Sequence, residues 1–169
     1  MKNFLLMFLT ILFMHTLRAQ SCNITSFPHT EDFTSTNSSL GCWTIINGGD
    51  ANTWVFSNNE ASIAYSSTAH DDYLITPQWS IQAGISDRIT FEARNRHTAY
   101  PEQFDVLLST TGTSPADFTE TIATNIVPPT ANQSYTYDLA AYIGQDVHLA
   151  FHSTTTDLLA LYIDNIEIQ

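Results

Sequence analysis

The sequence predicts an all-β protein, a two-sheet antiparallel β-sandwich with jelly-roll topology. Three observations lead to this fold class: short apolar runs of period two, turn signals at close spacing, and no helical stripe of useful length beyond residue 20. Ile89, Phe91 and Ala93, for example, alternate with polar residues, which gives a strand one apolar and one wet face. About ten such runs occur, a number that exceeds a minimal immunoglobulin sandwich and suits a jelly roll.

Turn residues separate the predicted strands. Gly, Asn and Pro are concentrated between the apolar runs, as at 47–50 and 110–115. Trp43 and Trp54 are large apolar side chains that suit the space between two sheets. The predicted strands lie at 43–46, 53–56, 62–65, 73–75, 89–94, 104–108, 119–126, 135–139, 147–152 and 161–168.

Residues 1–19 are predicted to be a signal peptide. A basic residue precedes an almost unbroken apolar run at 4–14, which is too short to span a bilayer, and Ala19 offers a small residue at the cleavage point. We therefore expect an exported protein whose single domain covers residues 20–169 and which does not insert into a membrane after cleavage. An uncleaved anchor or a lipoprotein signal, with Cys22 as the lipidated residue, is the alternative.

The charge of the expected mature chain argues against a nucleic-acid partner. After cleavage, three basic residues (Arg88, Arg94 and Arg96) oppose 17 acidic ones, a net charge of −14, and no lysine remains. Phosphate binding by counterion release needs clustered Lys or Arg. An acidic surplus instead suits a solvated surface or carboxylates gathered around a hard cation.

Size and cysteine content complete the predicted organisation. About 150 residues are enough for one domain with its own core, and we expect a monomer. Cys22 and Cys42 form an even pair in an exported chain, which predicts one disulfide that closes an N-terminal loop.

Seven motifs occur in one order along the chain, and with them it resembles the cleaved-adhesin domain family, the jelly-roll modules of gingipain and haemagglutinin surface proteins. The resemblance covers residues 27–169. It implies a module for adhesion or recognition, not an enzyme, secreted or held at the bacterial surface, whose partner is a host or bacterial surface protein or glycan. The motifs are Glu-Asp-Phe at 31–33, Cys-Trp-Thr at 42–44, Gly-Gly-Asp-Ala-Asn-Thr-Trp at 48–54, Asp-Asp-Tyr-Leu-Ile-Thr-Pro at 71–77, the segment from Tyr-Pro-Glu-Gln-Phe to Thr-Thr-Gly at 100–112, Asp-Phe at 117–118 and Leu-Tyr-Ile-Asp-Asn-Ile at 161–166.

The resemblance also implies a structural Ca²⁺ ion. In such jelly rolls the ion lies between the first strand, the loop before the second Trp and the last strand, and the oxygen-bearing side chains at those places suit Ca²⁺. Thr34 departs from the family, which usually has an acid there, so one ligand is missing or is replaced by Glu31 or Asp32. Alternatively, the acids at these places are ordinary turn and strand-end residues. The predicted ligands are Asp32, Asp50, Asn52 and Asp164.

The remaining chemistry-bearing residues do not form a recognisable catalytic or zinc motif. His148 and His152 are four residues apart on one strand, roughly 13 Å, which is too far for one tetrahedral ion. His70, beside Asp71 and Asp72, is interpreted as surface-loop composition. No Gly-x-Ser-x-Gly elbow occurs, although some pair of acids could still serve a small secreted hydrolase, which stays an alternative.

One loop is the best candidate for ligand recognition. Arg94, Arg96, His97 and Tyr100 lie close together in the sequence and include two of the three mature basic residues. Guanidinium groups suit carboxylates or sulfated sugars, and an exposed Tyr can stack on a sugar or a peptide. The alternative is that the arginines pair with neighbouring acids. A carbohydrate-binding module is a second functional alternative, and a planar strip of exposed Trp or Tyr on one sheet would favour it.

Overall fold

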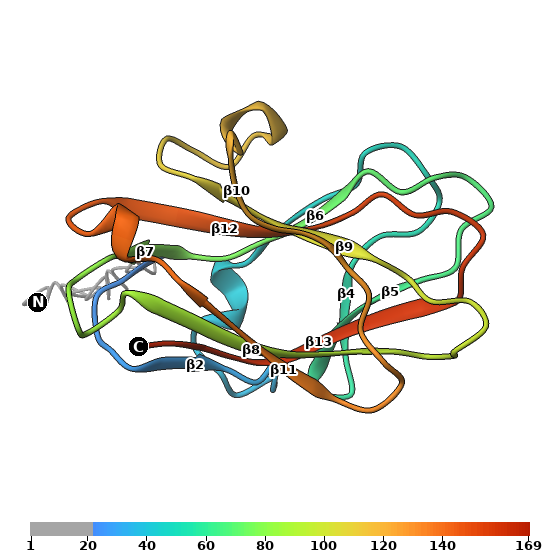
Figure 1. Ribbon diagram of the computed structural model, residues 1–169, viewed down its shortest axis with the longest axis horizontal. Coiled ribbons are helices and arrows are strands. Elements are labelled where there is room, and N and C mark those ends of the chain that lie inside the picture. Colours follow the sequence, from blue (N-terminus) through green and yellow to red (C-terminus); the bar gives the residue numbers. More distant parts are fainter. Residues whose placement is uncertain (1–21) are drawn as a thin grey trace, which may run out of the picture.

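The computed structural model describes residues 22–169, which form a two-layer all-β domain (Figure 1). The expected signal peptide at 1–19 lies outside the described residues. Alternation of burial is clearest in β8 (Arg88–Asn95), where every second residue is buried. The helical elements of the described residues are short 3₁₀ helices: η1 (Leu40–Cys42), η2 (Pro115–Asp117) and η3 (Ala140–Tyr142). The predicted fold class is confirmed.

The first sheet has seven strands with β12 (Asp146–Ser153) at its centre. β12 pairs antiparallel with β6, β7 and β9, while β3 extends the sheet from β6 and β10 extends it from β9. All its pairs are antiparallel except that between β1 and β7. The other strands are β1 (Asn23–Ile24), β3 (Thr44–Ile46), β6 (Asp72–Ile75), β7 (Gln78–Ser80), β9 (Phe104–Ser109) and β10 (Glu120–Ile126).

The second sheet has six strands around β13 (Ala160–Ile168). β13 pairs with β8 along one edge and with β5 and β2 along the other, and all pairs are antiparallel. Figure 1 shows this sheet below the first, with loops that join the two layers at both ends of the sandwich. The other strands are β2 (His29–Glu31), β4 (Val55–Ser57), β5 (Glu60–Ala64) and β11 (Gln133–Asp138).

The space between the sheets is filled by large apolar side chains. Phe91 from the second sheet contacts Phe104 and Phe151 from the first, with ring centroids 6.0 and 5.0 Å apart in edge-on arrangements. Trp43 and Trp54 belong to the same cluster, as the sequence predicts. Each of these side chains stabilises the domain by roughly 2 to 3 kcal/mol through burial.

Three short strands, β1, β2 and β7, were not predicted. They have two or three residues each, too few for an alternating pattern to be recognised. β1 follows Cys22, whose predicted disulfide with Cys42 is present and joins the N-terminal segment to η1.

The N-terminal segment is also held by a buried acid. Glu31 is 1% exposed, and its carboxylate accepts hydrogen bonds from the Phe33 amide (2.8 Å), the Ser39 hydroxyl (2.5 Å) and the Trp43 indole (3.0 Å). Because these three donors use the oxygens of the Glu31 carboxylate, Glu31 in this structure helps to pack β2.

Within residues 22–169 there is no helix with the length and hydrophobicity that crossing a membrane would require.

Candidate functional site

Four loops converge at one end of the sandwich, the right-hand end in Figure 1, and we call this region the loop end. The loops are residues 47–54, 65–71, 96–103 and 154–159. Each joins a strand of one sheet to a strand of the other.

Hydrogen bonds join these loops to one another. The Asn52 side chain donates to the Tyr65 carbonyl, and the Tyr65 amide donates to the Leu159 carbonyl (2.7 Å). The His70 amide donates to the Thr155 carbonyl (2.8 Å), and the Thr155 hydroxyl donates to the Glu102 carboxylate. Each loop therefore depends on the others for its position.

His70 lies at the centre of the loop end, and the prediction that it is a surface-loop residue is wrong. Its side chain is 1% exposed, and its Nδ1 atom lies 2.7 Å from Asp50 Oδ2 and 3.0 Å from Asp72 Oδ2. Among the described residues these three form the one group of His, Cys, Asp or Glu side chains whose ligand atoms all lie within 4.8 Å of one another. We call it the His70 cluster.

The local backbone explains why the cluster forms. Gly48 packs so closely on Asp71 that a Cβ atom there would lie 2.0 Å from the Asp71 carbonyl oxygen, so only glycine fits. This close approach lets the Gly48 amide donate to Asp72 Oδ1 at 3.0 Å. Asp72 is the first residue of β6 and is itself fully buried, so the sheet fixes its side chain beneath the loop.

Burial governs the ionisation of the acids near His70. It raises the pKa of Asp72, and the Asp50 charge raises it further, against the lowering effects of the Gly48 amide and His70. Burial raises the pKa of Glu102 to about 7, against a lowering effect of the His70 charge. The region thus contains three acids and one imidazole in a place that water hardly reaches.

The four predicted calcium ligands do not surround one point in this structure. Asn52 bonds to Tyr65, just beyond the end of β5, whereas Asp164 lies near enough to Glu60, at the start of β5, for the Glu60 charge to act on its pKa. β5 has five residues, roughly 16 Å of strand. Ca²⁺ ligands lie at about 2.3 to 2.6 Å, so one ion cannot reach both ends. The Asp50 carboxylate accepts a hydrogen bond from the Asn52 backbone amide (2.9 Å), so Asp50 lies with Asn52, away from Asp164.

Asp32 and Asp164 instead share an acidic surface of the second sheet. Burial raises the pKa of Asp164, as do the negative charges of Glu60, Glu92 and Asp32. Hydrogen bonds from the Thr34 side chain and amide lower the pKa of Asp32, since they stabilise its charged form. Thr34, the departure from the family pattern, therefore acts as a hydrogen-bond donor to the acid two residues before it (2.8 Å).

The predicted recognition residues divide into two groups. Arg94 lies in β8, where its guanidinium pairs with Glu60 (2.7 Å) and stacks 3.7 Å from the centre of the Tyr162 ring. It is therefore held on the sheet surface, as the alternative interpretation expected. Arg96, His97 and Tyr100 are exposed in the loop end.

An exposed aromatic surface extends beyond the predicted residues. Tyr100 is 51% exposed and its ring centroid lies 5.9 Å from that of His97. The backbone of Tyr65, which is 45% exposed, is joined to that of Tyr100 through Leu159, which accepts from the Tyr65 amide and donates its own amide to the Tyr100 carbonyl (3.5 Å). Tyr65 could not be linked to Tyr100 from the sequence, because the connection passes through a third loop.

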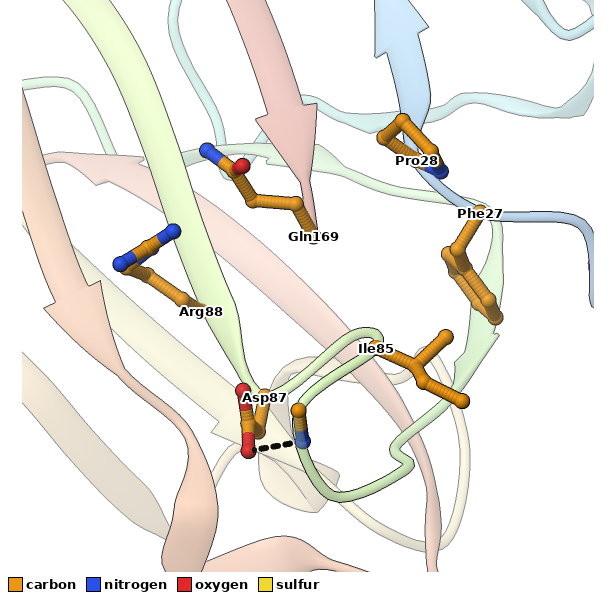
Figure 2. Close-up of a pocket in the computed structure, with 7 residues that line it drawn as sticks. Phe27, Pro28, Ile85, Asp87, Arg88 and Gln169 are labelled. Atoms are coloured by element: carbon orange, nitrogen blue, oxygen red, sulfur yellow. Dashed lines mark hydrogen bonds between the residues drawn. The ribbon is translucent and has the colours of Figure 1, made fainter.

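Two of the hollows on the described surface bear on the site. One, of about 410 Å³, adjoins the loop end and is lined by His97, Thr98, Pro101 and the 127–130 turn. The other, of about 470 Å³, lies at the opposite end of the sandwich. Figure 2 shows it with Phe27 and Ile85 on one side and Arg88 on the other, while Asp87 accepts a hydrogen bond from the turn at Gly84 (2.6 Å).

Comparisons with known proteins connect this geometry to one family of binding domains. Hemagglutinin A of Porphyromonas gingivalis (strain ATCC BAA-308 / W83) is 32% identical over 116 residues, which are 58% of this chain. The chain spans only 5% of that relative's length.

Solved structures show the same fold. The K1 and K3 cleaved adhesin domains of Lys-gingipain from P. gingivalis W83 align with TM-scores of 0.67 and 0.68 at 22% and 21% identity, over 85% and 83% of this chain and 98% of each domain. A CBM4 structure aligns with a TM-score of 0.51 at 16% identity, over 75% of this chain and 86% of its own. The model of the Cleaved Adhesin Domain family matches residues 28–168, and the chain therefore belongs to that family.

Proposed function

We propose that this chain is an exported adhesion or recognition module that binds a surface protein or glycan through its loop end. The observation that carries the proposal is the exposed surface formed by Tyr65, His97 and Tyr100 on loops that hydrogen bonds hold in place. Rigid aromatic groups bind with a small loss of conformational entropy. Membership of an adhesin domain family and the likeness to P. gingivalis Hemagglutinin A support a role at the cell surface or after secretion.

The arrangement favours a loop-borne site over a flat glycan platform on a sheet. All three tryptophans, Trp43, Trp54 and Trp79, are buried, so none is free to stack on a sugar. The exposed aromatic groups are instead Tyr65 and Tyr100 at the loop end. A carbohydrate-binding role would therefore use a short edge site for a few sugar units.

Tyr100→Ala tests this proposal. The substitution should weaken binding to the captured surface protein or arrayed glycan by at least tenfold, because it removes the more exposed of the two tyrosine rings. Ile85→Ala is the control, since Ile85 is equally exposed (50%) but lies at the opposite hollow. Equal binding by both variants, measured by glycan array and by pull-down from host and bacterial surface fractions, would refute a loop-end site.

Structural calcium remains part of the proposal, at the acidic surface of Asp32 and Asp164. Burial raises the pKa of Asp164, and the charges of Glu60, Glu92 and Asp32 raise it further; a hard cation would relieve that repulsion. Calcium added to EDTA-treated protein should raise the thermal midpoint, and Asp164→Asn should reduce that rise. An unchanged midpoint in the wild type would contradict calcium binding.

A hydrolase is disfavoured by the burial of the candidate acids. Asp50, Asp72 and Glu102 converge on His70, but their side chains and the imidazole have almost no contact with solvent. A substrate cannot reach them without movement of the loops. Recognition by the exposed residues above them needs no such movement.

A further inference from the structure

The His70 cluster contains buried polar atoms that have no hydrogen-bond partner. Two carboxylate oxygens, Asp50 Oδ2 and Asp72 Oδ2, approach the same nitrogen, His70 Nδ1, at 2.7 and 3.0 Å. One imidazole nitrogen can donate one proton, and the contact with Asp72 has hydrogen-bond geometry. Asp50 Oδ2 is then left buried without a hydrogen-bond partner, although its side chain is 0% exposed.

The other ring nitrogen is unmatched as well. His70 Nε2 is buried and also has no hydrogen-bond partner. A buried carboxylate oxygen without a partner destabilises the folded state, because it has lost its hydrogen bonds to water. A proton on Nδ1 therefore satisfies only one of the two carboxylates, whereas a cation that contacts all three ligand atoms would satisfy both; Nε2 lies outside that contact.

We propose that Asp50, His70 and Asp72 form a binding site for a divalent transition-metal ion of the zinc type. One imidazole nitrogen and two carboxylate oxygens, with a water molecule in the fourth position, make a tetrahedral ligand set that Zn²⁺ accepts. Metal–ligand distances of about 2.0 to 2.2 Å require ligand atoms roughly 3.3 Å apart. The present separations of 2.7 and 3.0 Å would thus need to widen by about half an ångström.

The surroundings orient the three ligands toward one point. Asp50 Oδ1 accepts from the Asn52 amide (2.9 Å) and Asp72 Oδ1 from the Gly48 amide (3.0 Å), so each acid turns its Oδ2 atom inward. The backbone of His70 is fixed by its bond to Thr155. Outer hydrogen bonds of this kind position ligands in metal sites.

The donor set distinguishes this site from the calcium site proposed above. Ca²⁺ takes six to eight oxygen ligands, whereas the His70 cluster supplies a nitrogen and two carboxylates in a closed space. Glu102 is close enough to His70 for their charges to interact, but it would not be a ligand of the ion. The inference does not depend on which ligand the loop end binds.

Titration of Zn²⁺ into the full chain, stripped with EDTA and dialysed, tests the site. Calorimetry should show one equivalent bound, and the thermal midpoint should rise. His70→Ala and Asp50→Asn should each weaken zinc binding at least 100-fold. His152→Ala is the matched control, because His152 also pairs with an acid (Asp71, 2.8 Å) but lies outside the cluster, and it should bind zinc within threefold of the wild type.

Spectroscopy of the wild-type protein tests the site even if the substituted variants do not fold. In the zinc-loaded wild type, nitrogen NMR should show one imidazole bound to the metal through Nδ1, and Co²⁺ in place of Zn²⁺ should give the strong visible absorption of a tetrahedral site. The proposal is overturned if zinc does not bind saturably, if His152→Ala removes binding while His70→Ala does not, or if Ca²⁺ fills the same site in preference to Zn²⁺.

Discussion

Replacing Glu102 with glutamine should remove a pH-dependent loss of stability from this domain. Burial raises the pKa of Glu102 from an ordinary 4.5 to about 7, while in the unfolded chain the group returns to its ordinary value. Between these two values the folded state holds one proton more than the unfolded state. The free energy of unfolding therefore falls as the pH rises through this range.

The size of the effect follows from the two pKa values. The stabilising contribution of the protonated acid is fully present below about pH 4.5 and is lost as the pH passes 7. Each pH unit in between is worth about 1.4 kcal/mol, so the total is roughly 3 kcal/mol. Glutamine has the shape of the protonated acid and cannot ionise. Glu102→Gln should match the wild type within about 1 kcal/mol at pH 4.5 and exceed its stability by about 3 kcal/mol at pH 8.

Urea unfolding at both pH values checks this prediction. EDTA is included so that no metal at the neighbouring cluster alters the charge balance. Glu120→Gln, on the exposed surface of β10, controls for the loss of one carboxylate from an acidic protein. A difference between Glu102→Gln and the wild type that is the same at pH 4.5 and pH 8 would show that burial does not hold the proton on Glu102.

Three further variants test the fold itself by urea or thermal unfolding. Glu31→Ala should cost about 3 kcal/mol, because it leaves buried donors including the Trp43 indole without an acceptor, and a cost below 1 kcal/mol would mean that water replaces the carboxylate. Removal of the disulfide by Cys22→Ser with Cys42→Ser should cost about 3 kcal/mol for a loop of this length, with no further loss in reductant. Phe151→Ala should cost about 3 to 5 kcal/mol, and a smaller loss would indicate that the sheets close over the cavity.

The fold was predictable because its physical cause is local. Alternation in segments such as 89–94 and 147–152 follows directly from the two faces of a strand, and the structure buries the predicted apolar face of each. The other face of β12 is not fully exposed as expected, because Ala150 is buried in a small cluster with Tyr73 and Ile75. β1 and β7 could not be found in the same way. They are strands because of the partners that they pair with, and the disulfide at Cys22 brings β1 to its place.

The functional residues were less predictable, because their roles depend on contacts between distant loops. Arg94 and Arg96 are two residues apart, yet one is paired with Glu60 on a sheet and the other is exposed in a loop. His70 was misjudged for the opposite reason: a polar run of His and Asp has the composition of a surface loop. Its position directly before the buried strand β6 was the available signal, since that strand carries Asp72 inside.

The His70 cluster and the exposed aromatic surface are parts of one assembly of loops. Asn52 connects them, because its backbone amide donates to the Asp50 carboxylate while its side-chain amide donates to the carbonyl of Tyr65. An ion that widens the cluster by displacing Asp50 would act on Tyr65 through a single residue. In a domain whose two sheets are rigid and closely packed, such a connection is how an internal site can change the shape of a binding surface without changing the fold.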